Sequence, residues 1–556
     1  MIRLFVPVLL LTLLACGPYE ALKQKQNEVA GRDEKVEKEV PGKKLEARKR
    51  DQSKSQDYLM VAGKVAAPAP HSTAAPVAME EGIRQFNTEE YDRIYENEFK
   101  DARQNPLSTF SIDVDTASYA NVRRFITGSQ LPPKDAVRIE EMINYFSYDY
   151  PQPRGKHPFS ITSEISTCPW AKEHKLIHIG LQGKSLDYDH LKPCNLVFLV
   201  DSSGSMSSEN KLPLLKQSFK LLLDELDDRD RIAIVAYASA AGLVLPSTPA
   251  SQKEEILTAL DSLHAGGSTA GGAGIRLAYQ AAKENLISGG NNRVILATDG
   301  DFNVGVSSTS ELVRLIEEKR KDDIYLTILG FGMGNYKDGR MEQISNAGNG
   351  NYFYIDSIQE ARKVFVREMR ANLFTIAKDV KIQIEFNPAL VKAYRLVGYE
   401  NRVLANEDFN DDKKDAGELG AGHTVTALYE IIPAGADEEV RKTDGLKYQQ
   451  YRLKNRAKSG EIMTVKLRYK PPKREKSILI EDTVTDSDAA LERSSDNFRF
   501  SAAVAGFGML LRDSKFKGDM TYERVISLAK GSTGKDSEGY RAEFIKLAET
   551  CALLSQ

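Results

Sequence analysis

Short apolar runs alternate with segments of helical periodicity in the middle of the chain. The runs are continuous, which is typical of strands buried on both faces, and they lie at 195–200, 231–237, 293–297, 324–329 and 351–355. A helical stripe follows the first run at Leu215, Phe219, Leu222 and Leu226, and further helices are expected at 252–263, 271–286, 308–321 and 357–372. This order predicts an α/β domain with a doubly wound, mainly parallel sheet.

The residues on either side of this domain alternate between apolar and polar with a period of two, as half-buried antiparallel strands do. The apolar positions are Val380, Ile382, Ile384 and Phe386, and later Met463, Val465, Leu467 and Tyr469. Similar short strands are expected at 160–165 and 175–181. We hypothesise that the two flanks pair into one β-sandwich with the α/β domain inserted between its strands. A ladder between residues 160–182 and 378–470 would support this arrangement.

From about residue 497 the pattern returns to helices, with an apolar stripe at Phe544, Leu547, Cys551 and Leu554. Cys551 is therefore expected in the core. The predicted organisation is a signal peptide (1–15), a disordered tether (16–85), an N-terminal extension domain (86–155), the first part of the β-sandwich (156–190), the α/β domain with a metal site (191–373), the second part of the sandwich (374–480) and a C-terminal helical region (490–556).

The first residues predict a targeting segment. The apolar run 4–14 is long enough for the core of a signal peptide and too short to span a bilayer. It ends in Leu13-Leu14-Ala15-Cys16, which resembles a bacterial lipobox, so Cys16 would carry the lipid and anchor the chain to a membrane. An ordinary signal peptide with an incidental Cys is the alternative. Gly17 instead of Asp favours the outer membrane, if the cell has one, and an extracytoplasmic location in the cell envelope.

The tether is predicted from composition. A mixed-charge stretch and then the Ala/Pro-rich run AAPAPHSTAAPVA occupy residues up to about 79, and neither can bury a core. The chain as a whole has 556 residues with 41% hydrophobic and 28% charged residues, so wholesale disorder is excluded. Lys and Arg number 76 against 79 Asp and Glu, and with a net charge of −3 no nucleic-acid partner is expected.

Four cysteines are too few for a disulfide scaffold. Cys168 and Cys194 either form one disulfide or remain free, buried thiols. The second interpretation is favoured because lipidation of Cys16 leaves an odd number.

Candidate chemistry lies where predicted strands end. Asp201-Ser202-Ser203-Gly204-Ser205 follows the first strand, Thr298-Asp299-Gly300 follows a later one, and Gly266-Gly267-Ser268-Thr269 forms a loop between two helices. Together they bring two carboxylates and three hydroxyls to one rim of the sheet. Hard oxygen ligands of this kind suit Mg²⁺ or Mn²⁺.

This set, D-x-S-x-S with a later Thr and T-D-G, resembles the metal-ion-dependent adhesion site of von Willebrand factor type A domains. The resemblance implies that Ser203, Ser205 and Thr269 are hydroxyl ligands and that Asp201 and Asp299 bind the ion directly or through water. Polar loops that only cap helices are the alternative. Asp301 and Asn303 lie near the rim or, as we favour, in a solvated turn, and His264 is left outside the site.

Segments 87–92, 107–119 and 138–146 resemble the N-terminal extension of a family of bacterial von Willebrand factor type A lipoproteins. Within them, Asp113 and Asp115 form a D-x-D that either binds a second cation or, as we favour, belongs to a helix start or turn.

No H-E-x-x-H, C-x-x-C or G-x-S-x-G motif occurs. The residues that a zinc site or a serine hydrolase would need are therefore missing, and no enzyme activity is expected. The resemblance implies a lipid-anchored protein that binds a partner presenting an Asp or Glu side chain. The alternatives are a periplasmic scaffold or assembly factor of an envelope complex, and a metal-assisted hydrolase that would need a nucleophile and base not found here.

Overall fold

The computed structural model describes residues 89–556 except 187–191, 270, 301–308, 335, 369–370, 372, 441–443, 445–446 and 449–451. The predicted signal peptide, Cys16 and the whole of the predicted tether lie outside the described residues. Within the described part of the chain, no helix combines the length and apolar character needed to cross a bilayer.

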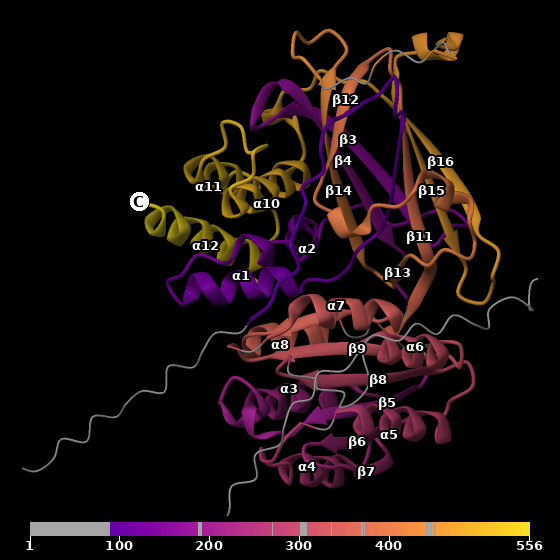
Figure 1. The fold of residues 1–556 in the computed structure, drawn as a ribbon, viewed down its shortest axis with the longest axis vertical. Coiled ribbons are helices and arrows are strands. Elements are labelled where there is room, and N and C mark those ends of the chain that lie inside the picture. The colour runs from indigo at the N-terminus through magenta and orange to yellow at the C-terminus, as the bar shows by residue number, and fades with distance from the viewer. Residues whose placement is uncertain are drawn as a thin grey trace, which may run out of the picture. The chain divides into compact units, whose positions relative to one another are not determined.

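The predicted α/β domain is present (Figure 1). Its six strands have the order β10-β9-β8-β5-β6-β7, parallel except for the antiparallel pair of β6 and β7. The strands are β5 (Cys194–Asp201), β6 (Arg231–Tyr237), β7 (Ala241–Pro249), β8 (Asn291–Thr298), β9 (Ile324–Phe331) and β10 (Tyr352–Ile355). All five expected strands are therefore confirmed. Strand β7 was not predicted, because its Gly and Pro residues are typical of loops; its place at the sheet edge is one where Pro is tolerated.

Helices cover both faces of this sheet. One face packs against α3 (Leu212–Glu225), α4 (Lys253–Asp261) and α8 (Ile358–Arg362). The other packs against α5 (Gly271–Glu284), α6 (Thr309–Arg320) and α7 (Asp338–Ala347). Helix α8 continues as a π-helical turn, Lys363–Glu368. The doubly wound prediction is confirmed, although α7 was missed.

The flanking segments form two antiparallel sheets around one core. The first has the order β1-β12-β14-β4-β3 and contains β1 (Lys100–Asp101), β3 (Phe159–Cys168), β4 (Ala171–Gly183), β12 (Val391–Val397) and β14 (Thr424–Pro433). The second contains β2 (Leu107–Ser111), β11 (Thr375–Phe386), β13 (Gly417–Gly420), β15 (Glu461–Lys470) and β16 (Ile478–Thr485). Strand β4 pairs with β14, with Ile177 opposite Tyr429. The expected ladder between the two flanks is confirmed.

The N-terminal extension contributes to both bodies of the fold. Strand β1 pairs with β12, and β2 pairs with β11, so each sheet of the sandwich gains an N-terminal strand. Helix α1 (Ala117–Thr127) buries Ala117 and Ala120 against the α/β domain. Helix α2 (Ile139–Asn144) faces the C-terminal helices instead.

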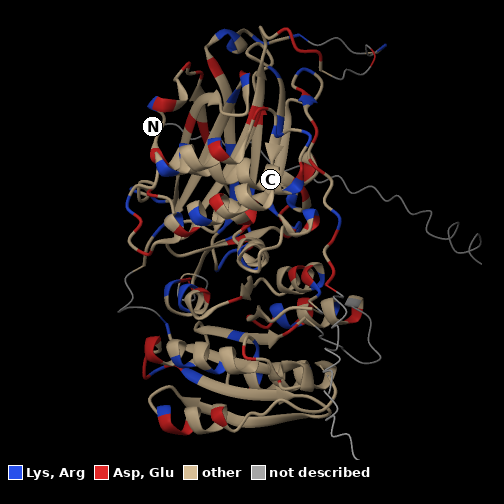
Figure 2. Ribbon diagram, turned by 90° about the vertical axis from the view of Figure 1, so that its left-hand side faces the viewer, with Lys and Arg blue, Asp and Glu red and all other residues tan. Residues whose placement is uncertain are grey.

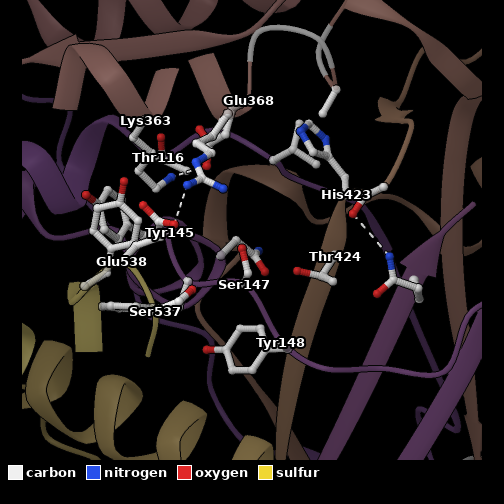
Figure 3. Close-up of a pocket in the computed structure, with 18 of the residues that line it drawn as sticks. Thr116, Tyr145, Ser147, Tyr148, Lys363, Glu368, His423, Thr424, Ser537 and Glu538 are labelled. Atoms are coloured by element: carbon white, nitrogen blue, oxygen red, sulfur yellow. Dashed lines mark hydrogen bonds and ion pairs between the residues drawn. The ribbon is translucent and has the colours of Figure 1, made fainter. Parts of the chain in front are cut away.

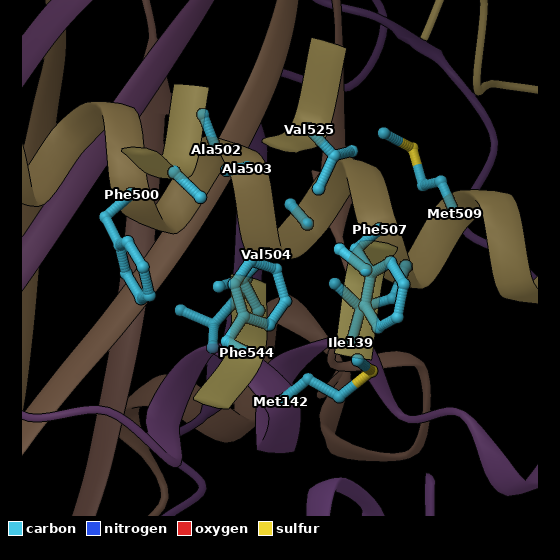
Figure 4. Packing of buried hydrophobic residues seen from close by; sticks show 14 of the residues in the cluster. Ile139, Met142, Phe500, Ala502, Ala503, Val504, Phe507, Met509, Val525 and Phe544 are labelled. Atoms are coloured by element: carbon cyan, nitrogen blue, oxygen red, sulfur yellow. The ribbon is translucent and has the colours of Figure 1, made fainter. Parts of the chain in front are cut away.

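Three helices end the chain: α10 (Asp496–Arg512), α11 (Tyr522–Lys530) and α12 (Tyr540–Leu554). Figure 4 shows Val504 and Phe507 of α10 and Phe544 of α12 in one cluster with Ile139 and Met142 of α2. In the predicted stripe, Phe544, Leu547 and Cys551 are buried, whereas Leu554 is 37% exposed. Cys168, Cys194 and Cys551 are all buried thiols.

Both acidic and basic residues are spread over the described elements (Figure 2). Some of them form buried ion pairs at the junction of the α/β domain with the sandwich. Arg402, between β12 and β13, contacts Asp113 at 3.0 Å, Asp115 at 3.2 Å and Glu342 of α7 at 3.6 Å. The Asp115 Oδ1 atom also accepts the backbone N–H of Tyr352, at the outer edge of strand β10, at 2.9 Å. The D-x-D is thus part of a buried ion network.

A second arginine extends this network. Arg138, just before α2, donates to Glu141 and to Asp338, the first residue of α7. Both carboxylates are buried, and Glu141 also accepts the backbone N–H of Ser118 at 2.8 Å. The N-terminal extension therefore holds the α7 side of the α/β domain through charge-assisted hydrogen bonds.

We predict that Arg402→Met destabilises the protein by about 3–5 kcal/mol, because it leaves buried carboxylates without their cation. Urea unfolding followed by circular dichroism measures the change. Arg456, whose side chain is 77% exposed and pairs with Glu461, is the matched control. Arg456→Met should leave the stability nearly unchanged, because exposed ion pairs contribute little; equal losses for the two variants would contradict the importance of the network.

The network also predicts a pH dependence. Burial and the neighbouring Asp113 raise the pKa of Asp115 to about 8, although Arg402 opposes this shift. An unfolded Asp has a pKa of about 3.9, so the folded chain binds this proton more tightly and Asp115 costs stability as the pH rises from about 4 to about 8.

In Asp115→Asn, the free energy of unfolding should fall by at least about 1 kcal/mol less than in the parent between about pH 4 and about pH 8. The reason is that the amide cannot ionise, while its oxygen still accepts the N–H of Tyr352. Thermal unfolding at a series of pH values measures it. Asp224→Asn, at a carboxylate that is 75% exposed, serves as the control and should leave the slope unchanged. A parallel pH dependence of the parent and Asp115→Asn would refute the assignment.

Candidate metal centre

The fold brings the three predicted loops to one edge of the α/β sheet. Asp201 ends β5, and Asp299 directly follows β8, which is the parallel neighbour of β5. The loop containing Thr269 is fastened to the Asp201 loop, because Gly204 N–H donates to the Gly267 carbonyl at 3.0 Å and Gly266 N–H donates to Ser202 at 2.8 Å. The candidate residues therefore share one rim, as the carboxyl ends of parallel strands do.

Asp201 is fully buried and held by three donors. Its Oδ1 accepts the backbone N–H of Ser203 at 2.9 Å, and its Oδ2 accepts the hydroxyls of Tyr237 at 3.0 Å and Thr298 at 3.3 Å. Burial raises the pKa of Asp201, hydrogen bonds from Ser203 oppose the rise, and the nearby Asp299 adds to it. The carboxylate is thus fixed in orientation before any ligand binds.

Two of the predicted hydroxyls are already close together. Ser203 Oγ and Ser205 Oγ are 3.0 Å apart, on the tight turn that follows β5. Neighbouring ligands of an octahedral Mg²⁺, at metal–oxygen distances of about 2.1 Å, are separated by about 3 Å. The spacing suits either a shared cation or a hydrogen bond between the two hydroxyls.

Asp299 has a partner that the sequence did not indicate. Its Oδ2 accepts a hydrogen bond from Lys211 Nζ at 2.9 Å, and both side chains are buried. Lys211 directly precedes α3, and nothing in its local sequence distinguishes it from other loop lysines.

The structure describes only some of the remaining candidate residues. Thr269 is half-buried at the end of its loop, and residue 270 is not described. Asp301 and Asn303 lie outside the described residues. His264 is exposed and remains outside the site.

A separate cavity of about 510 Å³ lies where the extension, the α/β domain, the sandwich and the C-terminal region meet (Figure 3). Its charged side chains largely pair with each other, since Lys363 contacts Glu368 and Arg367 contacts Glu538. None of the predicted metal ligands lines it.

The donor set at the rim fits a hard divalent cation. Among the described residues no group of three or more His, Cys, Asp or Glu side chains is suited to hold a metal. The candidate centre is of a different kind, with two carboxylates and three hydroxyls, and such all-oxygen sets suit Mg²⁺ or Mn²⁺ rather than zinc.

Three family models match successive parts of the chain. The model described as von Willebrand factor matches residues 85–178, von Willebrand factor type A domain matches 195–367, and uncharacterized protein YfbK, C-terminal, matches 371–554.

Two relatives and one solved structure extend the comparison. The chain is 43% identical over 489 residues to the uncharacterized protein YfbK of Escherichia coli (strain K12), covering 86% of this chain and 84% of that protein. It is 27% identical over 235 residues to the uncharacterized protein sll0103 of Synechocystis sp., covering 41% of this chain and 54% of that protein. The structure of von Willebrand factor type A from Catenulispora acidiphila aligns with a TM-score of 0.38 and 16% identity, over 74% of this chain and 99% of that one.

Proposed function

Because the chain belongs to the YfbK family of bacterial von Willebrand factor type A proteins, we propose that it is a lipid-anchored envelope protein that binds a partner protein through a divalent cation. Von Willebrand factor type A domains commonly mediate interactions between proteins. A binding role, rather than an enzymatic one, is therefore the proposal.

One observation carries the proposal: the Ser203 and Ser205 hydroxyls lie 3.0 Å apart on the rim that also holds two buried carboxylates. Ser203, Ser205 and Thr269 would hold Mg²⁺ or Mn²⁺ through neutral oxygens, with Asp201 and Asp299 close by. When bound, the cation supplies a Lewis-acid position that an Asp or Glu side chain of the partner can occupy.

The residues of the chain itself provide orientation. Tyr237 and Thr298 lie beneath the rim and donate to Asp201, while Ser203 N–H fixes the other carboxylate oxygen. This prearrangement reduces the reorganisation needed when a ligand binds.

Membrane attachment is the second part of the proposal. The lipobox-like sequence ending in Cys16 would place the lipid at the start of a tether of about seventy residues before the described fold. A tether of this length, partly Pro-rich, would let the metal rim reach partners away from the membrane surface.

We predict that the purified full-length protein binds Mg²⁺ and Mn²⁺ in calorimetric titrations, and that Ser203→Ala/Ser205→Ala weakens binding at least about tenfold because two ligands are lost. Asp299→Ala should abolish binding. Ser207→Ala removes an exposed hydroxyl from the same turn and should leave the affinity unchanged.

Circular dichroism confirms that each variant is folded. Equal affinity of the parent and the double Ser variant would place the cation elsewhere. Absence of binding to every protein would argue against a metal centre.

The anchoring proposal has its own test. Cys16→Ser should move the protein from the membrane pellet to the soluble fraction of broken cells, because the thiol that carries the lipid is absent. Cys551→Ser, which removes a buried thiol from α12, should still sediment with membranes. Sedimentation of Cys16→Ser with the membranes would contradict a lipid anchor at this residue.

A further inference from the structure

We infer that Lys211 is a built-in counter-ion of Asp299 that holds down the affinity of the metal centre for a divalent cation. The inference deepens the proposed function and rests on it. Its starting point is the buried contact of 2.9 Å between Lys211 Nζ and Asp299 Oδ2, in which the lysine side chain is 8% exposed and the carboxylate is not exposed at all.

The position of Lys211 is fixed by packing. Its aliphatic stem crosses Gly332, the residue after β9, so closely that a Cβ on Gly332 would lie 2.1 Å from Lys211 Cε and 2.7 Å from Cγ. Gly332 has a φ of +76°, and its carbonyl accepts the hydroxyl of Tyr354. The stem of Lys211 occupies the space that a Cβ on Gly332 would fill, and the ammonium group at its end contacts Asp299.

The backbone of Lys211 is also held. Its N–H donates to the Ser208 carbonyl at 2.9 Å, and its carbonyl accepts Leu215 N–H at 2.8 Å in the first turn of α3. The lysine therefore connects the start of α3, the end of β9 and the carboxylate after β8.

The electrostatic consequence follows from the charges at the rim. Asp201 and Asp299 are the two predicted carboxylate ligands at the rim, and the ammonium group of Lys211 offsets the charge of Asp299. A divalent ion that approaches Asp299 is repelled by the ammonium group and competes with it for the carboxylate. Because the pair is buried, salt screens this competition less than it would on the surface. Lysine suits the role, since its ammonium is a point charge on a flexible stem.

The test is a calorimetric titration of Mn²⁺ into the full-length protein and into Lys211→Met, with circular dichroism to confirm folding. Methionine keeps most of the unbranched stem against Gly332 and removes the charge. We expect Lys211→Met to bind Mn²⁺ at least about tenfold more tightly. Lys211→Arg, which keeps the charge, should bind no more tightly than the parent.

A matched control removes a lysine from the same helix. Lys220 on α3 is 49% exposed and lies near Asp261 rather than the rim, so Lys220→Met should leave the affinity unchanged. If Lys211→Met does not fold, Lys211→Gln replaces it, with the same expected direction.

Each outcome is decisive. Tighter binding by the neutral Lys211 variant alone supports the inference. If folded Lys211→Met binds Mn²⁺ no more tightly than the parent, the inference about Lys211 is wrong, but the proposed metal centre is still supported by binding to the parent. Absence of Mn²⁺ binding to every folded protein overturns the proposed metal centre itself, and this inference with it.

Discussion

The buried arginine–carboxylate network at the edge of strand β10 is the contact on which the arrangement of the whole chain depends. The α/β domain is inserted between β4 and β11, so two chain crossings alone would leave it free to swing. Arg402 and Arg138 add to the packing of α1 against this domain, because each contacts a carboxylate of α7 together with at least one carboxylate of the N-terminal extension. Ions taken out of water need such partners, and removing one partner leaves an uncompensated charge.

The same network lies close to the candidate metal centre. Asp338, which pairs with Arg138, begins α7, and its N–H donates to Glu90 while Glu90 N–H donates to Tyr336. A Cβ on Gly300, the residue after Asp299, would lie 2.9 Å from Tyr336 Cα. The first described residues of the chain are thus hydrogen-bonded to Tyr336, which packs against the residue that follows the candidate ligand Asp299. Tyr336 therefore contacts both the segment that follows the proposed tether and the loop that begins at the candidate metal rim.

Sequence reasoning succeeded where a local pattern carries the information. Continuous apolar runs located five of the six strands of the α/β sheet, and period-two alternation located the strands that make the β4–β14 ladder. It failed for α7, whose buried apolar residues are only Met341 and Ile344. It also failed for the charges. Asp113 was noticed, but its partner Arg402 is 289 positions away, and spacing cannot reveal a pair that only the fold brings together.

Buried carboxylates in this protein are paired with arginine at the domain junction and with lysine at the rim, and the two residue types differ in how firmly they hold a carboxylate. At the junction, buried carboxylates are paired with arginines, whose planar groups hold several oxygens at once and stay charged at any ordinary pH. At the rim, Asp299 is paired with a lysine, which makes a single hydrogen bond through a flexible stem. Displacing an arginine that contacts three acidic groups would break several contacts, whereas separating Lys211 from Asp299 would break one hydrogen bond while the lysine stem stays packed against Gly332. The residues present therefore suit a permanently buried ion network at the junction and, under the proposed function, a carboxylate at the rim that a cation would share with a lysine.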